Sequence, residues 1–332
     1  ESAGPVQSSP APEEITVPYQ TPAANAEPID PSQSSGSDSS QTTDGTSQGK
    51  KDSSMTAITP ELSDDGTISP SHGSSAFDNK SDEKMDALVT QVQSQLPGAN
   101  GSWSVYICDL ADGSEATIND SPMQAARLIK LFIMGAVYEN YDSLSQQYGS
   151  ATLDSYLTPM ITVSDNESFN ELVRLQTTSG VFKDGAEAVN AFLAESQFAD
   201  TSVQHTLSPS ASKDAGLGGR NTTSVKDCGE LLSRIYKGEC VSKEASEAML
   251  NLLLNQQVTT KIPSGISASV EIANKTGETD TDQHDIAIVY GEKTTYILCV
   301  MSENCKSGDA VSHIRDISGI VYNYLNMRLD QD

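Results

Sequence analysis

The N-terminal part of the chain has little that could build a hydrophobic core. Between Glu1 and Asn79 the sequence is a loose mixture of Ser, Pro, Thr, Gln, Gly and Asp, it contains no cysteine, and Tyr19 and Phe77 are its only aromatic residues. Such a composition cannot bury enough apolar surface to offset the entropy lost on ordering. We therefore expect residues 1–80 to be a disordered tail or linker, and residues 81–332 to form one folded domain.

Basic residues are scarce throughout. The 332 residues include 20 Lys and Arg against 46 Asp and Glu, which gives a formal net charge of −26. Binding to nucleic acid needs clustered Lys and Arg to neutralise phosphates, and an anionic membrane surface needs them likewise. No run of about 18 apolar residues occurs, so the sequence predicts no transmembrane segment. Nucleic acids and membranes are therefore not expected partners.

The cysteines and histidines lack the spacing of a metal site. The five cysteines form no CxxC pair and the four histidines are scattered, so we expect neither a metal nor another cofactor. Cys108 and Cys299 lie in two apolar segments and could form a disulfide if those segments are neighbouring strands, with buried free thiols as the alternative. Cys228 and Cys240 bracket a predicted helix and would be about 18 Å apart, too far for a disulfide.

The start of the chain suggests processing. It begins with Glu1 rather than Met, and a polar spacer precedes the domain. Both features are typical of a protein whose signal or anchor has been removed and which a flexible segment holds off a membrane or wall. We therefore expect a secreted or surface-anchored protein, and a monomer.

Residues beyond 80 alternate between helical and strand patterns. Apolar residues at helical spacing predict helices over 82–96, 125–138, 167–175, 186–198, 224–236, 242–255 and 310–325. Apolar runs separated by turn residues predict strands over 103–110, 114–118, 269–274, 285–290 and 295–301. This order predicts an α/β (α+β) fold, in which a five-stranded antiparallel sheet from both ends of the domain is flanked by helices and carries an inserted helical lobe.

Four tyrosines gather in one stretch of the predicted lobe, at Tyr138, Tyr141, Tyr148 and Tyr156. Aromatic rings in such segments more often fill space or line a rim than form a stacking platform. We therefore expect these tyrosines to be packing and rim residues.

Three short motifs carry the chemistry. Lys130 lies one turn into the 125–138 helix, which is apolar nearly all round; Ser164-Asp165-Asn166 precedes a helix; and Lys275-Thr276-Gly277 ends a predicted strand. Each pattern alone is common, and Ser-Asp-Asn is also an ordinary helix N-cap. Their order, spacing and placement on these elements make the combination much more specific.

Together the motifs resemble the signatures of the class A β-lactamase and penicillin-binding protein superfamily, with Lys130 as the lysine of the first signature. The stretch Pro122–Met134 and the stretch Arg220–Ser224 are also similar to class A-like serine hydrolases of Gram-positive bacteria. The resemblance spans about Asp82 to Arg328. It implies the β-lactamase/transpeptidase-like fold, which agrees with the order of predicted elements.

The sequence departs from that family at the nucleophile. The family's first signature is Ser-x-x-Lys, in which serine and lysine lie one helical turn apart, but this chain has Arg127-Leu128-Ile129-Lys130. Arginine cannot act as an acyl-transfer nucleophile and stays protonated. A cation one turn from Lys130 should also lower the pKa of that lysine. The interval 200–219 further lacks the glutamate that activates the deacylating water in class A enzymes.

The resemblance implies roles for the remaining motif residues. Ser164 would relay a proton to the leaving nitrogen, and Asn166 would hold the amide carbonyl of the substrate. Lys275 and Thr276 would bind the substrate carboxylate, next to Gly277 of the same signature.

Two open questions concern Arg127. By resemblance, its backbone N–H and that of Glu278 would form the oxyanion hole. Its side chain, with Lys130 and Lys275, could make a cationic pocket for a carboxylate. Alternatively, it could turn to solvent or pair with an acid such as Glu167.

Three functions follow. The first is a pseudoenzyme that binds a β-lactam or a peptidoglycan stem peptide with little or no hydrolysis. The second is a β-lactamase or D,D-peptidase family member whose serine has been replaced at position 127. The third is a cell-surface interaction module that uses another face. Retention of the three motifs argues against the third function and does not decide between the other two.

Overall fold

The structure is a computed structural model, and it describes residues 76–96, 100–207 and 216–327. Contacts divide the chain into a unit up to Ser69 and a second unit, Pro70–Asp332. The expected tail lies outside the described residues except at its end, where helix α1 (Ala76–Gln93) begins before the predicted boundary at residue 80. None of the helices in the described ranges is long and apolar enough to cross a membrane.

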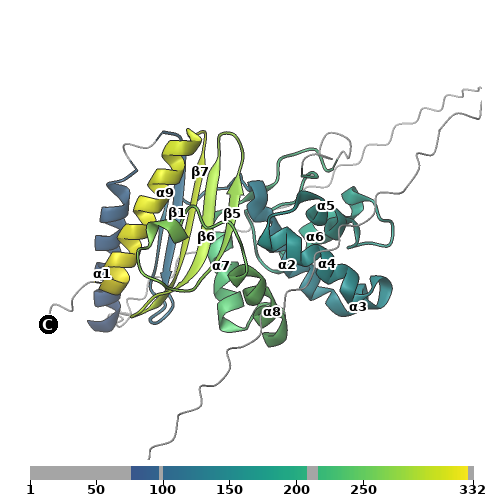
Figure 1. Ribbon diagram of the computed structural model, residues 1–332, viewed down its shortest axis with the longest axis horizontal. Helices are drawn as coiled ribbons and strands as arrows, with labels where there is room; N and C mark the ends of the chain where they lie inside the picture. Colours follow the sequence, from purple (N-terminus) through teal and green to yellow (C-terminus); the bar gives the residue numbers. More distant parts are fainter. Residues whose placement is uncertain (1–75, 97–99, 208–215, 328–332) are drawn as a thin grey trace, which may run out of the picture. The chain divides into compact units, whose positions relative to one another are not determined.

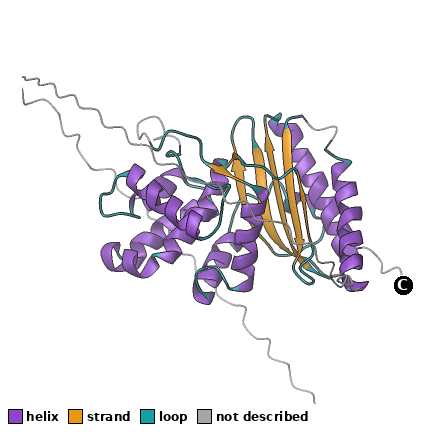
Figure 2. Cartoon of the chain, turned by 180° about the vertical axis from the view of Figure 1, so that it is seen from behind, coloured by secondary structure: helices purple, strands orange, loops and turns teal. Residues whose placement is uncertain are grey.

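A five-stranded antiparallel sheet forms the centre of this unit (Figures 1 and 2), as the sequence predicted. The strand order is β2-β1-β7-β6-β5, and every neighbouring pair is antiparallel. The strands are β1 (Ser102–Asp109), β2 (Glu115–Ile118), β5 (Ile272–Glu278), β6 (Gln283–Tyr290) and β7 (Thr295–Glu303). The first and last parts of the domain therefore meet side by side at the β1–β7 pair.

Helices cover both faces of the sheet. Helices α1 and α9 (Ser307–Tyr322) pack together on one face, and α7 (Val225–Lys237) lies on the other. The inserted lobe lies between the short strands β3 (Met123–Gln124) and β4 (Thr222–Thr223), which pair with each other. It comprises the 3₁₀ turn η1 (Ala126–Leu128) and the helices α2 (Ile129–Glu139), α3 (Tyr141–Tyr148), α4 (Ser150–Thr162), α5 (Asn166–Arg174) and α6 (Phe182–Glu195), with α8 (Lys243–Leu254) packed against α4.

The two faces of the sheet belong to two hydrophobic clusters. Along β1, Val105 and Ile107 pack with the α1/α9 layer, while Tyr106 and Cys108 pack with α7 and the lobe. Successive side chains of a strand point to opposite faces, so a strand that is covered on both sides is apolar at nearly every position. This explains why residues 103–110 read as one continuous buried run.

Two sequence predictions differ from the structure. Residues 141–162 form helices α3 and α4, which were not predicted, because α3 is mostly polar and α4 contains Pro159. The predicted strand 269–274 is wrong in its bounds, since β5 begins at Ile272 and continues through Glu278. Residues 275–278 are mostly polar, so their composition did not indicate a strand, but they pair with β6. Lys275-Thr276-Gly277 therefore lies within a strand rather than after one.

All five cysteines are buried and free. Cys108 opposes Ile297, and Cys299 opposes Tyr106, so the two cysteines occupy diagonal positions on neighbouring strands. Diagonal positions are about 7–8 Å apart, which is too far for a disulfide. Of the two alternatives for this pair, the structure has the free thiols.

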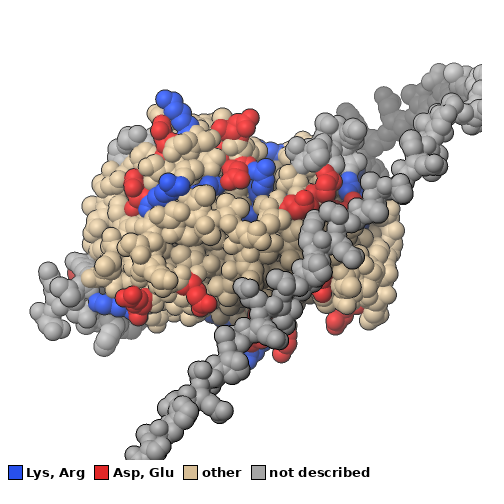
Figure 3. Space-filling model, in the orientation of Figure 1, with Lys and Arg blue, Asp and Glu red and all other residues tan. Residues whose placement is uncertain are grey.

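Charges of the described residues are mixed on the face that Figure 3 shows. There, Lys and Arg side chains lie singly or next to acidic ones rather than in one broad area. This distribution fits the excess of acidic residues in the composition.

Candidate active site

The three predicted motifs meet where the lobe joins the edge strand β5. Lys130 Nζ donates to the Ser164 carbonyl oxygen at 2.6 Å and to Asn166 Oδ1 at 2.7 Å, and lies 3.3 Å from Ser164 Oγ. Lys275 Nζ donates to the same Ser164 Oγ at 2.8 Å. Ser164 thus joins a lysine of the lobe to a lysine of the sheet, and the set Lys130, Ser164, Asn166 and Lys275 is called the lysine cluster below.

Lys130 is buried because its helix is buried. Helix α2 is apolar on every side, with Ile129 and Leu131 fully covered, so the amine can only extend toward the start of α5. Its three hydrogen-bond partners are all neutral. Burial, with the nearby Lys275 and Arg127 charges, lowers the pKa of Lys130 to about 6. The predicted decrease is confirmed in direction, and burial is the larger cause.

The Ser164-Asp165-Asn166 turn caps helix α5 and presents Ser164 to the two lysines. Asp165 is the N-cap of α5 and accepts a hydrogen bond from Ser168 N at 2.7 Å. Ser164 has a φ of +60°, a left-handed conformation that few non-glycine residues adopt. The cap anchors the turn, and the unusual backbone directs both the carbonyl and the hydroxyl of Ser164 toward the lysines.

Strand β5 brings Lys275 to the lysine cluster. Its Nζ donates to Ser164 Oγ and to the Thr276 carbonyl oxygen, both at 2.8 Å. Gly277 explains how the strand approaches η1, because a Cβ there would lie only 3.1 Å from Leu128 Cγ and from the His284 ring. Burial lowers the pKa of Lys275 to about 7, although Asp285 and Glu278 oppose this shift. Both lysines of the cluster therefore lose their protons near neutral pH.

Arg127 does not pair with Glu167. Its Nη1 donates to the Glu278 carbonyl oxygen at 2.6 Å and lies 3.9 Å from Glu278 Oε1. The side chain is 33% exposed, and it extends from η1 to the end of β5. The preceding residue, Ala126, has a φ of +46°, which marks a strained entry into this turn.

A second group of buried polar residues supports β5 from behind. Lys261 Nζ donates to the carbonyl oxygens of Gly277 and His284 at 3.2 and 3.0 Å, and to Glu278 Oε2 at 3.0 Å. His284 Nε2 donates to the Gln124 carbonyl oxygen, since its Nδ1 accepts from Ser302 N. Burial lowers the pKa of His284 to about 4, so this ring is neutral.

Sequence reasoning missed these residues because they belong to no motif. Lys261 lies in a loop without periodicity, and only the β5–β6 hairpin brings Gly277 and His284 to it. Asp285 is buried as well and accepts from Ile262 N and Asn274 Nδ2 at 2.8 and 3.0 Å. Burial raises the pKa of Asp285 to about 6. In the sequence, Asp285 appears as a charged residue at the start of an apolar strand, which is a weak signal of a site.

Asn170 fixes part of the interval 200–219, in which the sequence has no glutamate. Its Oδ1 accepts from Leu207 N at 2.8 Å, and its Nδ2 donates to the Leu207 carbonyl oxygen at 3.1 Å and to Glu167 Oε2 at 3.2 Å. The described parts of the interval, 200–207 and 216–219, contain no glutamate. Lys213 and Asp214 lie outside the described residues.

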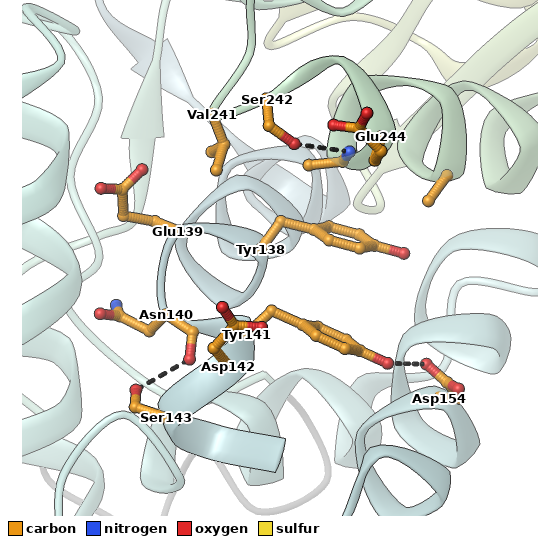
Figure 4. Close-up of a pocket in the computed structure, with 12 residues that line it drawn as sticks. Tyr138, Glu139, Asn140, Tyr141, Asp142, Ser143, Asp154, Val241, Ser242 and Glu244 are labelled. Carbon is orange, nitrogen blue, oxygen red and sulfur yellow. Dashed lines mark hydrogen bonds between the residues drawn. The ribbon is translucent and has the colours of Figure 1, made fainter. Parts of the chain in front are cut away.

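A separate hollow of about 760 Å³ opens between the end of α2, helices α3 and α4, and the start of α8 (Figure 4). Tyr138 and Tyr141 lie in it with ring planes 10° apart and centroids 5.4 Å apart, and Tyr141 donates to Asp154 Oδ1 at 2.9 Å. These two rim residues thus stack on one another, which the sequence did not predict. The lysine cluster does not line this hollow.

The comparison with protein families decides the assignment. The model of the beta-lactamase enzyme family matches residues 86–149 and 143–325. The chain belongs to this family. The structure agrees with solved members of the fold. A beta-lactamase from Sphaerobacter thermophilus is 19% identical, with a TM-score of 0.62, over 74% of this chain and 98% of that one.

Two further structures show the range of this class A-like fold. PBP-A is 21% identical with a TM-score of 0.61, over 71% of this chain and 95% of that chain. The TLA-1 extended-spectrum beta-lactamase is 18% identical with a TM-score of 0.62, over 72% and 98%. At these identities the likeness establishes the fold alone. No curated protein sequence matches the chain.

Proposed function

We propose that the site around the lysine cluster binds a β-lactam or a peptidoglycan stem peptide with little or no hydrolysis. The observation that carries this proposal is the lysine cluster itself, which is hydrogen-bonded as one set, while the position one turn before Lys130 holds Arg127. In the family that the motifs resemble, that position supplies the attacking serine. The chain thus combines a complete set of binding residues with a missing nucleophile.

Both ligand classes carry a carboxylate, which suits the cations Lys275 and Arg127. Lys275 uses two of its three N–H groups within the described structure, for Ser164 and Thr276, and the third can donate to a ligand. The planar Arg127 guanidinium has several donors and spends one on Glu278 O. A bound carboxylate would raise the pKa of both Lys130 and Lys275, so binding should take up protons near pH 7.

Covalent chemistry lacks its first step. Acylation needs a hydroxyl whose proton a base removes while the oxygen attacks the carbonyl carbon. Lys130, with a pKa near 6, could accept such a proton at neutral pH. The guanidinium of Arg127 has no such oxygen and remains protonated. The ligand would therefore leave unchanged.

The proposal also includes the location at which the protein acts. A chain that binds peptidoglycan peptides or β-lactams acts outside the cell membrane, and the polar N-terminal stretch would serve as a spacer from a surface. Detection of the protein in the external fraction of its cells would support this part, whereas a purely internal location would contradict it.

Equilibrium binding of benzylpenicillin tests the proposal. Isothermal titration calorimetry should show saturable binding, and the intact mass of the protein should stay unchanged. Lys275→Met should abolish binding, while Lys243→Met, which removes an exposed cation on α8, should leave it intact. Turnover of a chromogenic cephalosporin by the unmodified chain would contradict the proposal, as would the absence of binding.

A further inference from the structure

Glu278 already places a carboxylate between Lys261 and Arg127. Its Oε2 lies 3.0 Å from Lys261 Nζ and its Oε1 lies 3.9 Å from Arg127 Nη1. Burial alone would raise the pKa of Glu278, but Lys261, Arg127 and Lys275 together lower it below its usual value. The side chain is therefore ionised, and it is surrounded by three of the cations that could receive an anionic ligand.

Lys261 has no donor left for a ligand. An ammonium group has three N–H donors, and those of Lys261 donate to Gly277 O, His284 O and Glu278 Oε2. The side chain of Lys261 is only 2% exposed, so it cannot turn outward. Two of its partners are backbone carbonyls fixed in the β5–β6 hairpin. The Glu278 carboxylate is the one partner that can move away.

Glu278 is free to make that movement. Its side chain is 40% exposed at the end of β5, so rotation would carry the carboxylate into water rather than into the core. Two carboxylates cannot occupy one small cationic position, because like charges at contact repel strongly. A ligand carboxylate that reaches Lys261 must therefore replace that of Glu278.

We propose that the Glu278 carboxylate is a resident counter-ion that occupies the carboxylate position between Lys261 and Arg127, and that it must swing outward before a carboxylate ligand binds there. Lys261 then becomes a direct ligand contact, in addition to Lys275 and Arg127. Glu278 sets the specificity of this site, since only a ligand that binds these cations better than Glu278 does can replace it. The assignment of a β-lactam or peptide as that ligand rests on the function proposed above.

The expected gain in affinity on removing the Glu278 carboxylate depends on the fraction of time for which it occupies the position. When a binding-competent arrangement is populated only in part, the apparent dissociation constant rises by the inverse of that fraction. If Glu278 holds the position for about nine-tenths of the time, its removal should tighten binding about tenfold.

Two probes test the inference, sodium acetate as the simplest carboxylate and benzylpenicillin. Each is titrated at constant ionic strength into the ¹⁵N-labelled chain and into its Glu278→Gln and Glu278→Ala variants, and the amide shifts of β5 are followed by NMR. Both variants should bind both probes about tenfold more tightly than the unmodified chain. Glu247→Gln changes the net charge equally on exposed α8 and should have no effect.

The outcomes separate this inference from the proposed function. Equal affinities of all three chains for both probes would overturn the inference and leave the function standing. Tighter acetate binding by the variants without any penicillin binding would support the inference and overturn the proposed function. If none of the chains binds either probe, both fail.

Discussion

Two buried lysines, one in the helical lobe and one behind strand β5, have equal numbers of hydrogen bonds but different partners. Lys130 comes from the helical lobe and meets the neutral oxygens of Ser164 and Asn166. Lys261 supports the sheet side and meets two carbonyls and the Glu278 carboxylate. Charge compensation, rather than the number of hydrogen bonds, distinguishes the two sites.

The difference separates two kinds of role. A buried amine without a counter-ion loses its proton easily, as the pKa of about 6 for Lys130 shows, and such an amine suits proton transfer. A buried amine that is paired with a carboxylate suits the holding of anions. Under the proposed function, the proton-transfer side lacks a nucleophile because Arg127 stands one turn before Lys130, while Lys261, Lys275 and Arg127 remain available to hold an anion.

The largest expected effect comes from removing the paired lysine. Lys261→Met would leave two buried carbonyl oxygens and Glu278 without their cation, so the free energy of unfolding should fall by about 2–4 kcal/mol. Urea denaturation measures this loss. Lys243→Met, which breaks a 3.8 Å pair between exposed side chains, should change it by less than about 0.5 kcal/mol. Equal losses in the two variants would contradict the distinction.

The unpaired lysine should instead produce a pH dependence. The unfolded chain keeps this lysine protonated up to about pH 10, whereas the folded chain releases the proton near pH 6. The unfolded state therefore binds more protons between these values, and stability rises with pH by up to about 1.4 kcal/mol per unit. Lys275, with a pKa of about 7, contributes a slope of the same sign, so Lys130→Met should lower the total slope between pH 7 and 9 by about 1.4 kcal/mol per unit rather than abolish it, as measured by urea denaturation at each pH. Parallel curves for the two chains would argue against a proton-releasing Lys130.

Substitutions in the Ser164 turn, which links Lys130 of the lobe to Lys275 of the sheet, should have the smallest effect on stability. Ser164→Ala and Ser164→Gly both remove the hydroxyl, but only glycine accepts the φ of +60° without strain. The glycine variant should be the more stable of the two by about 1 kcal/mol. Thermal unfolding of the pair measures this difference. If the alanine variant is equally stable, the turn carries no backbone strain.

The sequence predicted the parts of the fold that have a clear period or a motif. The apolar α2 helix and the three motif segments were found because burial and chemistry both leave a pattern in the residues. The extent of β5 was not found, because Lys275, Thr276 and Glu278 are polar although their strand is paired along its length. Lys261 and Asn170 were missed because their roles depend on contacts with residues far along the chain, at Gly277 and at Leu207.

The central claim of the proposed function is that the site keeps its binding residues and lacks only its nucleophile. Arg127→Ser tests it most directly, by intact-mass spectrometry of both chains after incubation with benzylpenicillin. We predict a covalent adduct on the Arg127→Ser chain alone, and a long-lived one, since the described part of the 200–219 interval offers no glutamate for deacylation. An adduct on the unmodified chain, or none on the Arg127→Ser chain, would contradict the claim.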